Sequence, residues 1–184
     1  MKTLFLSLLA VLGSVSALAA PSTAEVAELQ FHKLNRLVAT NKIDAAYVNH
    51  LGGITVKPDA GDLLVTFFQE NDSNGAPDRV IIRADLEGKP KSFEVIPGTK
   101  SLTYTDWTGK VPADILEKAV EYVSDTTTDA RLDIFRERIS SAVLLPQKDA
   151  SGLSAMVTVR AGERDGILLI HLDLAGKVLS VEKQ

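Results

Sequence analysis

Two segments of the chain, residues 80–86 and 168–174, alternate apolar and polar side chains in the same order, 88 positions apart. The residues of one face are apolar in both copies: Val80, Ile82, Ala84 and Leu86, and then Leu168, Ile170, Leu172 and Leu174. The opposite face is mixed or polar: Arg83 and Asp85, and then His171 and Asp173. One apolar and one mixed face is typical of an antiparallel strand that packs on one side only. The pattern therefore predicts two equivalent strands.

The same ten-residue pattern begins at the end of each segment, as "DLEGKPKSFE" at 85–94 and "DLAGKVLSVE" at 173–182. The Gly-Lys step predicts a turn into a second strand, through a two-residue or a four-residue loop. This register pairs apolar residues across both ladders: Ile82 with Phe93, and Ile170 with Val181. We expect the aspartate of each copy to accept hydrogen bonds from backbone amides of its turn.

Further elements are expected upstream of each hairpin. A strand is predicted from Asp62 ("DLLVTFFQ") and another from Leu153 ("LSAMVTVR"). A first helix opens with the capping box Ser22-x-x-Glu25, and its apolar stripe is Val26, Leu29, Leu34, Leu37 and Val38. Another begins near Pro112, with the stripe Ile115, Leu116, Ala119, Val120 and Val123. Two more helical segments are expected, at Ile43–Leu51 and along Leu132, Phe135, Ile139 and Val143.

These elements predict an α+β fold made of two tandem copies of a helix(-helix)–three-stranded antiparallel sheet unit. The first unit spans residues 20–96, a connector spans 97–111, and the second unit spans 112–184. Each unit alone is marginal for an independent core, so we expect the two to pack together, either sheet edge to sheet edge or through their helices.

The first 19 residues have the pattern of a secretory signal peptide. Lys2 is followed by an apolar run, and "ALA" at 17–19 is a small-x-small cleavage site, which predicts a mature chain beginning at Ala20. The apolar run is shorter than the ~20 residues that span a bilayer, and we expect no membrane insertion after cleavage. The predicted location is periplasmic or secreted. The chain contains no cysteine, so neither disulfides nor thiol chemistry contribute.

Charge and residue types narrow the possible functions. The formal net charge is −4, and loss of Lys2 with the leader makes it more negative, which argues against nucleic acid as a partner. The three histidines, His32, His50 and His171, have no second ligand at the spacing of zinc sites. No G-x-S-x-G elbow is present. We therefore expect no cofactor, no metal and no catalytic residue, although His171 beside Asp173 leaves acid–base chemistry as a minor option.

The helix-then-sheet order ending in strand-D-x-x-G-K-V resembles the PepSY and PepSY-like domains of bacterial secreted proteins. A tandem pair of such units is also similar to the β-lactamase-inhibitor-protein fold. "DLAGKVLSVE" matches the pattern better, whereas "DLEGKPKSFE" has Pro90 where an apolar residue is preferred. The resemblance implies an extracytoplasmic binding, inhibitory or chaperone-like role toward another protein, and it implies no catalytic residue.

The sequence thus predicts a non-enzymatic binding module for a protein or peptide partner. A small-molecule or lipid carrier, with a cavity between helices and sheet, is the alternative. The candidate partner-binding residues are those of the polar strand face and two aromatic residues of the connector: Arg83, Asp85, Glu94, Tyr104, Trp107, His171, Asp173 and Glu182.

Overall fold

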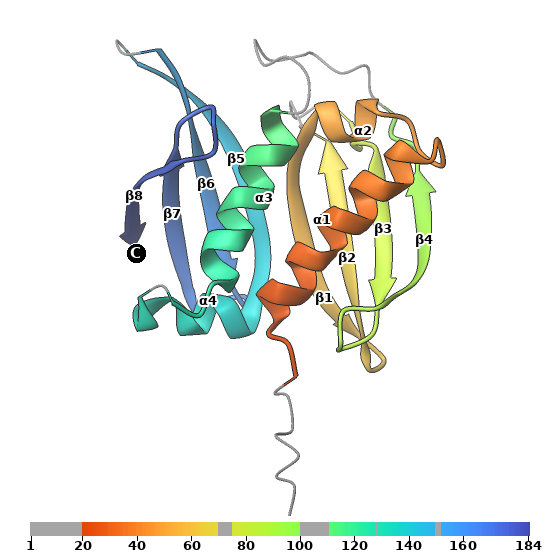
Figure 1. The fold of residues 1–184 in the computed structure, drawn as a ribbon, viewed down its shortest axis with the longest axis horizontal. Coiled ribbons are helices and arrows are strands. Elements are labelled where there is room, and N and C mark those ends of the chain that lie inside the picture. The colour runs from red at the N-terminus through yellow and green to blue at the C-terminus, as the bar shows by residue number, and fades with distance from the viewer. Residues whose placement is uncertain (1–19, 70–74, 100–110, 128, 150–151) are drawn as a thin grey trace, which may run out of the picture.

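The computed structural model describes residues 20–69, 75–99, 111–127, 129–149 and 152–184. The predicted leader and the aromatic candidates Tyr104 and Trp107 lie outside these residues. The described chain forms one eight-stranded antiparallel sheet, with its helices on one face (Figure 1). The strand order is β4-β3-β2-β1-β5-β6-β7-β8.

Each half of the chain contributes helices and then four strands. The N-terminal half consists of α1 (Thr23–Ala39), α2 (Ala46–Asn49), β1 (Leu51–Asp59), β2 (Asp62–Gln69), β3 (Arg79–Ala84) and β4 (Pro90–Ile96). The C-terminal half consists of α3 (Val111–Ser124), the 3₁₀ helix η1 (Ala130–Leu132), α4 (Asp133–Arg138), β5 (Ile139–Asp149), β6 (Gly152–Ala161), β7 (Gly166–Leu172) and β8 (Val178–Lys183).

The predicted fold of two units with three strands each is wrong, because the two central strands, β1 and β5, were not expected. They pair with each other and make the two halves one continuous sheet. β1 was not recognised in the sequence because it contains Gly52, Gly53 and Pro58, and glycine and proline disfavour strands. β5 was missed because Ile139 continues the apolar spacing of the preceding helix. In the structure α4 ends at Arg138, and Ile139 is the first residue of β5.

The junction between the halves carries the same 88-residue spacing as the repeated hairpins. Ile54 of β1 lies directly opposite Ala142 of β5, and Asp85 and Asp173 are separated by the same number of positions. Equivalent residues that face each other across an antiparallel pair are related by a two-fold rotation through that pair. The sheet therefore has an approximate two-fold axis at its centre.

The predicted core face of the hairpins is largely confirmed. Ile82 and Ile170 are fully buried, and the predicted pairings of Ile82 with Phe93 and of Ile170 with Val181 are both present. Leu86 and Leu174 are 50% and 41% exposed, so their assignment to the core face is wrong. Both lie beyond the last residues of β3 and β7, where the alternation of the strand has ended.

The helices complete this core from one side. The capping box of Ser22 and Glu25 is present at the start of α1. The apolar stripe of α3 is fully buried as predicted: Ile115, Leu116, Ala119, Val120 and Val123. In α1 the ring of Phe31 packs edge-on against Phe67 of β2, with centroids 5.0 Å apart. No helix of the described residues covers the opposite face of the sheet (Figure 1).

Candidate functional site

The candidate residues on the sheet do not form one cluster. Arg83 and Glu94 lie on β3 and β4, toward one edge of the sheet, whereas His171 and Glu182 lie on β7 and β8, toward the other. Five strand steps separate β3 from β7, which is about 24 Å at the usual strand spacing. A single small ligand cannot contact both groups.

Arg83 belongs to a compact ion cluster of the N-terminal half. Its Nη2 lies 2.5 Å from Asp59 Oδ2 and its Nη1 lies 3.5 Å from Asp62 Oδ2. Lys91 Nζ lies 2.5 Å from Asp62 Oδ1. Hydrogen bonding to Lys91, and then to Arg83, holds the pKa of Asp62 below its usual value. The cluster neutralises its own charges, so it offers little net charge to a partner.

The two repeated aspartates hold turns, as predicted. Asp85 Oδ1 accepts from the Lys89 amide at 2.7 Å. Asp173 Oδ1 accepts from the amides of Ala175 and Lys177, both at 2.9 Å. Asp173 Oδ1 is thus engaged within its own turn.

The outer edge of β8 presents main-chain groups that no other described strand pairs with. The Gln184 amide donates to the Ile167 carbonyl at 2.9 Å, and Glu182 lies opposite Leu169. Hydrogen bonds of an antiparallel ladder alternate between neighbouring residues. The N–H and C=O groups of Val181 and Lys183, which lie between the bonded positions, therefore point away from β7.

A pocket of about 190 Å³ lies beside these same two residues. Its apolar wall consists of Leu132, Leu168 and Val181, and Tyr122 of α3 completes it. Its polar rim consists of Asp129, Arg131 and Lys183. The pocket is thus formed where the segment between α3 and α4 approaches β7 and β8.

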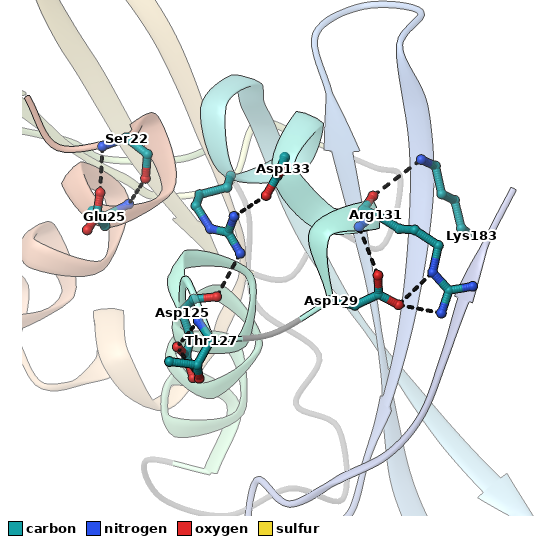
Figure 2. A network of polar contacts seen from close by, with 9 residues as sticks. Ser22, Glu25, Asp125, Thr127, Asp129, Arg131, Asp133 and Lys183 are labelled. Atoms are coloured by element: carbon teal, nitrogen blue, oxygen red, sulfur yellow. Dashed lines mark hydrogen bonds and ion pairs between the residues drawn. The ribbon is translucent and has the colours of Figure 1, made fainter. Parts of the chain in front are cut away.

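The rim residues contact one another (Figure 2). The guanidinium of Arg131 pairs with the carboxylate of Asp129, and Lys183 Nζ donates to the Arg131 carbonyl at 3.3 Å. Lys183 Nζ also lies 5.7 Å from the ring centroid of Phe135. The hydrogen bond between Asp129 and Arg131 lowers the pKa of Asp129 and raises the pKa of Arg131. Two cations and one anion give the rim a net positive charge.

A buried arginine fixes the segment that carries this rim. Arg136 of α4 donates through Nη2 to the Asp125 carbonyl at 2.7 Å and pairs with Asp133. The carboxylate of Asp125 accepts from the Thr127 amide at 2.8 Å. These bonds tie the end of α3 to the start of α4, so η1 is held against the sheet.

Sequence reasoning missed Tyr122, Arg131 and Lys183. "SDTTTD" at 124–129 indicates a break between two helices, but it does not show that the break lies next to β8. Val181 was expected to face the core, and period two places Lys183 on the same side. That alternation was the one available signal for the pocket.

Among the described residues, no three His, Cys, Asp or Glu side chains gather in a way that could hold a metal ion. None of the helices in that part of the chain is both long and apolar enough to cross a bilayer.

No model of a known protein family matches the chain, and no curated protein matches it either. Among solved structures it is similar to one described as "a putative lipoprotein" from Clostridium difficile 630, with 16% sequence identity and a TM-score of 0.32. That match covers 83% of this chain and 90% of the other. At such a score the likeness supports no conclusion about function.

Proposed function

We propose that the protein is an extracytoplasmic, non-enzymatic binding protein that accepts an extended segment of a protein or peptide as a ninth strand along β8. Its export is proposed from the leader pattern of residues 1–19. The observation that carries the proposal is the coincidence, at Val181 and Lys183, of outward main-chain groups with a pocket. In strand addition, main-chain hydrogen bonds supply affinity and pockets for alternate side chains supply specificity.

The edge of β8 also lacks the proline that stands at the start of the strand at the opposite edge. Proline and lysine commonly blunt exposed edge strands, and β4, at the other end of the sheet, begins with Pro90 and Lys91. β8 contains no proline, its one lysine, Lys183, is its last residue, and its Leu179 is 58% exposed. An added strand would therefore meet no proline along β8.

The carrier alternative has less support. Pockets for drug-sized ligands measure about 300–1,000 Å³, whereas the pocket beside β8 measures about 190 Å³. A larger hollow of about 540 Å³ is lined only by residues 38–45, a single segment of the chain, and does not lie between helix and sheet. The smaller volume beside β8 suits one side chain of a peptide better than a lipid. The space between the helices and the sheet is filled by large buried side chains, among them Phe31, Phe67 and Ile115.

Selection from a phage-displayed library of random 12-residue peptides tests the proposal. The target is the chain from Ala20 to Gln184, and the key variant is Val181→Pro, which removes one outward N–H without removing a donor from the β7–β8 ladder. The matched control, Val181→Ala, also shortens the side chain but keeps the N–H. We expect the selected peptides to bind Val181→Pro with an affinity about tenfold or more below their affinity for Val181→Ala. Equal binding to the two variants, or no enrichment at all, would refute the proposal.

A further inference from the structure

The geometry of β8 specifies which side chains an added strand would present to the pocket; this inference rests on the proposed function. The outward main-chain groups belong to Val181 and Lys183. Residues directly opposite each other in a sheet point to the same face. The ligand residues opposite Val181 and Lys183 therefore point toward the helix side of the sheet, where the pocket lies.

The ligand residue opposite Val181 meets an apolar surface. Val181 is half-buried and supplies the accessible apolar surface at this point, whereas Leu132 and Leu168, which also line the pocket, are 4% and 0% exposed. A polar side chain placed there would lose water without gaining a partner from these walls. An aliphatic side chain would instead cover the exposed part of Val181.

The ligand residue opposite Lys183 meets positive charge. The ammonium of Lys183 and the guanidinium of Arg131, 82% exposed, lie on the rim. Asp129 offsets one of these charges, which leaves one in excess. An acidic side chain at this position would meet that excess charge at the surface of the protein.

The spacing and the direction follow from the strand. Val181 and Lys183 are two positions apart, so their opposite residues are also two apart. Every strand pair of the sheet is antiparallel, and antiparallel pairing is the more stable arrangement per residue. In an antiparallel ligand, the residue opposite Lys183 precedes the residue opposite Val181.

We infer that the β8 edge selects extended segments with the sequence acidic–any–aliphatic, the aliphatic side chain entering the pocket and the acidic one facing Lys183 and Arg131. The order of the two residues matters, because the reversed sequence would place the carboxylate opposite the apolar Val181 and the aliphatic side chain opposite Lys183.

Four fluorescently labelled, threonine-rich eight-residue peptides test the inference by anisotropy titration. They contain Glu-Thr-Leu, Gln-Thr-Leu, Glu-Thr-Ser or the reversed Leu-Thr-Glu. We expect Glu-Thr-Leu to bind tightest, about three- to fivefold tighter than its Gln counterpart and about tenfold tighter than its Ser counterpart. Added salt should weaken the Glu-Thr-Leu peptide more than the Gln-Thr-Leu peptide.

Lys183→Gln is the variant that addresses the charge. It should abolish the preference for Glu over Gln while leaving the preference for Leu over Ser. Its matched control is Lys57→Gln, which removes an exposed lysine on β1 and should keep both preferences. Melting by circular dichroism confirms that both variants are folded.

Each outcome decides a claim. Equal binding of the Glu and Gln peptides, or tighter binding of the reversed peptide, overturns the inference. If none of the four peptides binds but library peptides bind in a manner that depends on Val181, the inference fails and the proposed function stands. If the library also yields nothing, both fail.

Discussion

The two halves of the sheet share an order of elements but end in different edges. At the edge of the N-terminal half, β4 begins with Pro90 and Lys91. At the edge of the C-terminal half, β8 has neither residue at its start and lies beside a pocket formed with the η1 segment. Both halves contain the hairpin, so the C-terminal edge is set apart by the segment between α3 and α4, which adds Asp129, Arg131 and Leu132 to the pocket beside β8.

The polar faces of the halves differ as well. The position of Arg83, held by Asp59 and Asp62, corresponds to His171, 88 positions later. The carboxylate nearest His171 in sequence, Asp173, is bound within its own turn. The two copies therefore share the turn, although the side chains around it differ.

The largest expected effect comes from a charge placed in either core. Ile82→Asp and Ile170→Asp each bury an unpaired carboxylate, which costs several kcal/mol against a total stability of about 5–15. Because β1 and β5 join the halves, either substitution should unfold both halves in one transition. Denaturant melts and hydrogen exchange measure this, and a half that stays protected would show that the sheet is not one cooperative unit.

Gly53 and Ser141, equivalent positions of the two central strands, should respond differently to alanine. A Cβ at Gly53 would lie 2.4 Å from Phe68 Cζ and 2.7 Å from the Ala142 carbonyl oxygen. We expect Gly53→Ala to lower the free energy of unfolding by about 1–3 kcal/mol, and Ser141→Ala to lower it by less than about 0.5 kcal/mol. Equal unfolding midpoints for the two variants would contradict the close approach of Phe68.

The two repeated aspartates should differ in their contribution to stability. Asp173 accepts two turn amides and Asp85 accepts one. At about 1 kcal/mol for each hydrogen bond, Asp173→Ala should lower the free energy of unfolding about twice as much as Asp85→Ala. Chemical denaturation of the two variants compares them directly, and the reverse order would refute this account of the turns.

The smallest effect concerns Glu117, where α3 contacts α1. Glu117 Oε1 lies 3.6 Å from His32 Nδ1, and Glu117 Oε2 accepts a hydrogen bond from the Asn35 side-chain amide. Burial raises the pKa of Glu117, although the nearby His32 acts to lower it. A raised pKa means that the folded state favours the protonated carboxyl. The protonated carboxyl therefore adds to the free energy of unfolding below pH 4.5, and this stabilisation is lost as the pH rises through the folded-state pKa. Glu117→Gln should therefore stabilise the protein at pH 7, by less than about 1 kcal/mol.

Thermal melts at pH 7 and pH 4 check the sign of that prediction. The gain at pH 7 should disappear at pH 4, where the wild-type carboxyl is itself largely protonated. A variant that is less stable than the wild type at pH 7 would contradict the raised pKa.

The sequence predicted the elements whose side chains follow one period without interruption. The alternation around Ile82 and Ile170 located two strands and their pairing partners correctly. β1 was missed because Gly52 and Gly53, its second and third residues, have no side chains to show alternation. The four-strand halves and the continuous sheet depend on this strand, so the overall architecture was mispredicted.

The candidate site was harder to predict because it depends on contacts between distant segments. Arg131 and Lys183 are 52 positions apart and meet through a side-chain-to-backbone hydrogen bond. Such a meeting has no periodic signature in a single sequence. The polar residues of the sheet were easy to identify, yet the arrangement of eight strands separates them into two groups at opposite ends.

Hydrogen exchange at single amides tests the central claim, that β8 accepts an added strand, most directly. With the tightest-binding peptide present, the amides of Val181 and Lys183 should become protected. The Glu182 amide, which faces Leu169, should be protected with or without the peptide. The amides of Phe93 and Val95 on the β4 edge should not change. Protection at Phe93 and Val95, or unchanged exchange at Val181 and Lys183 in a saturated complex, would contradict the account.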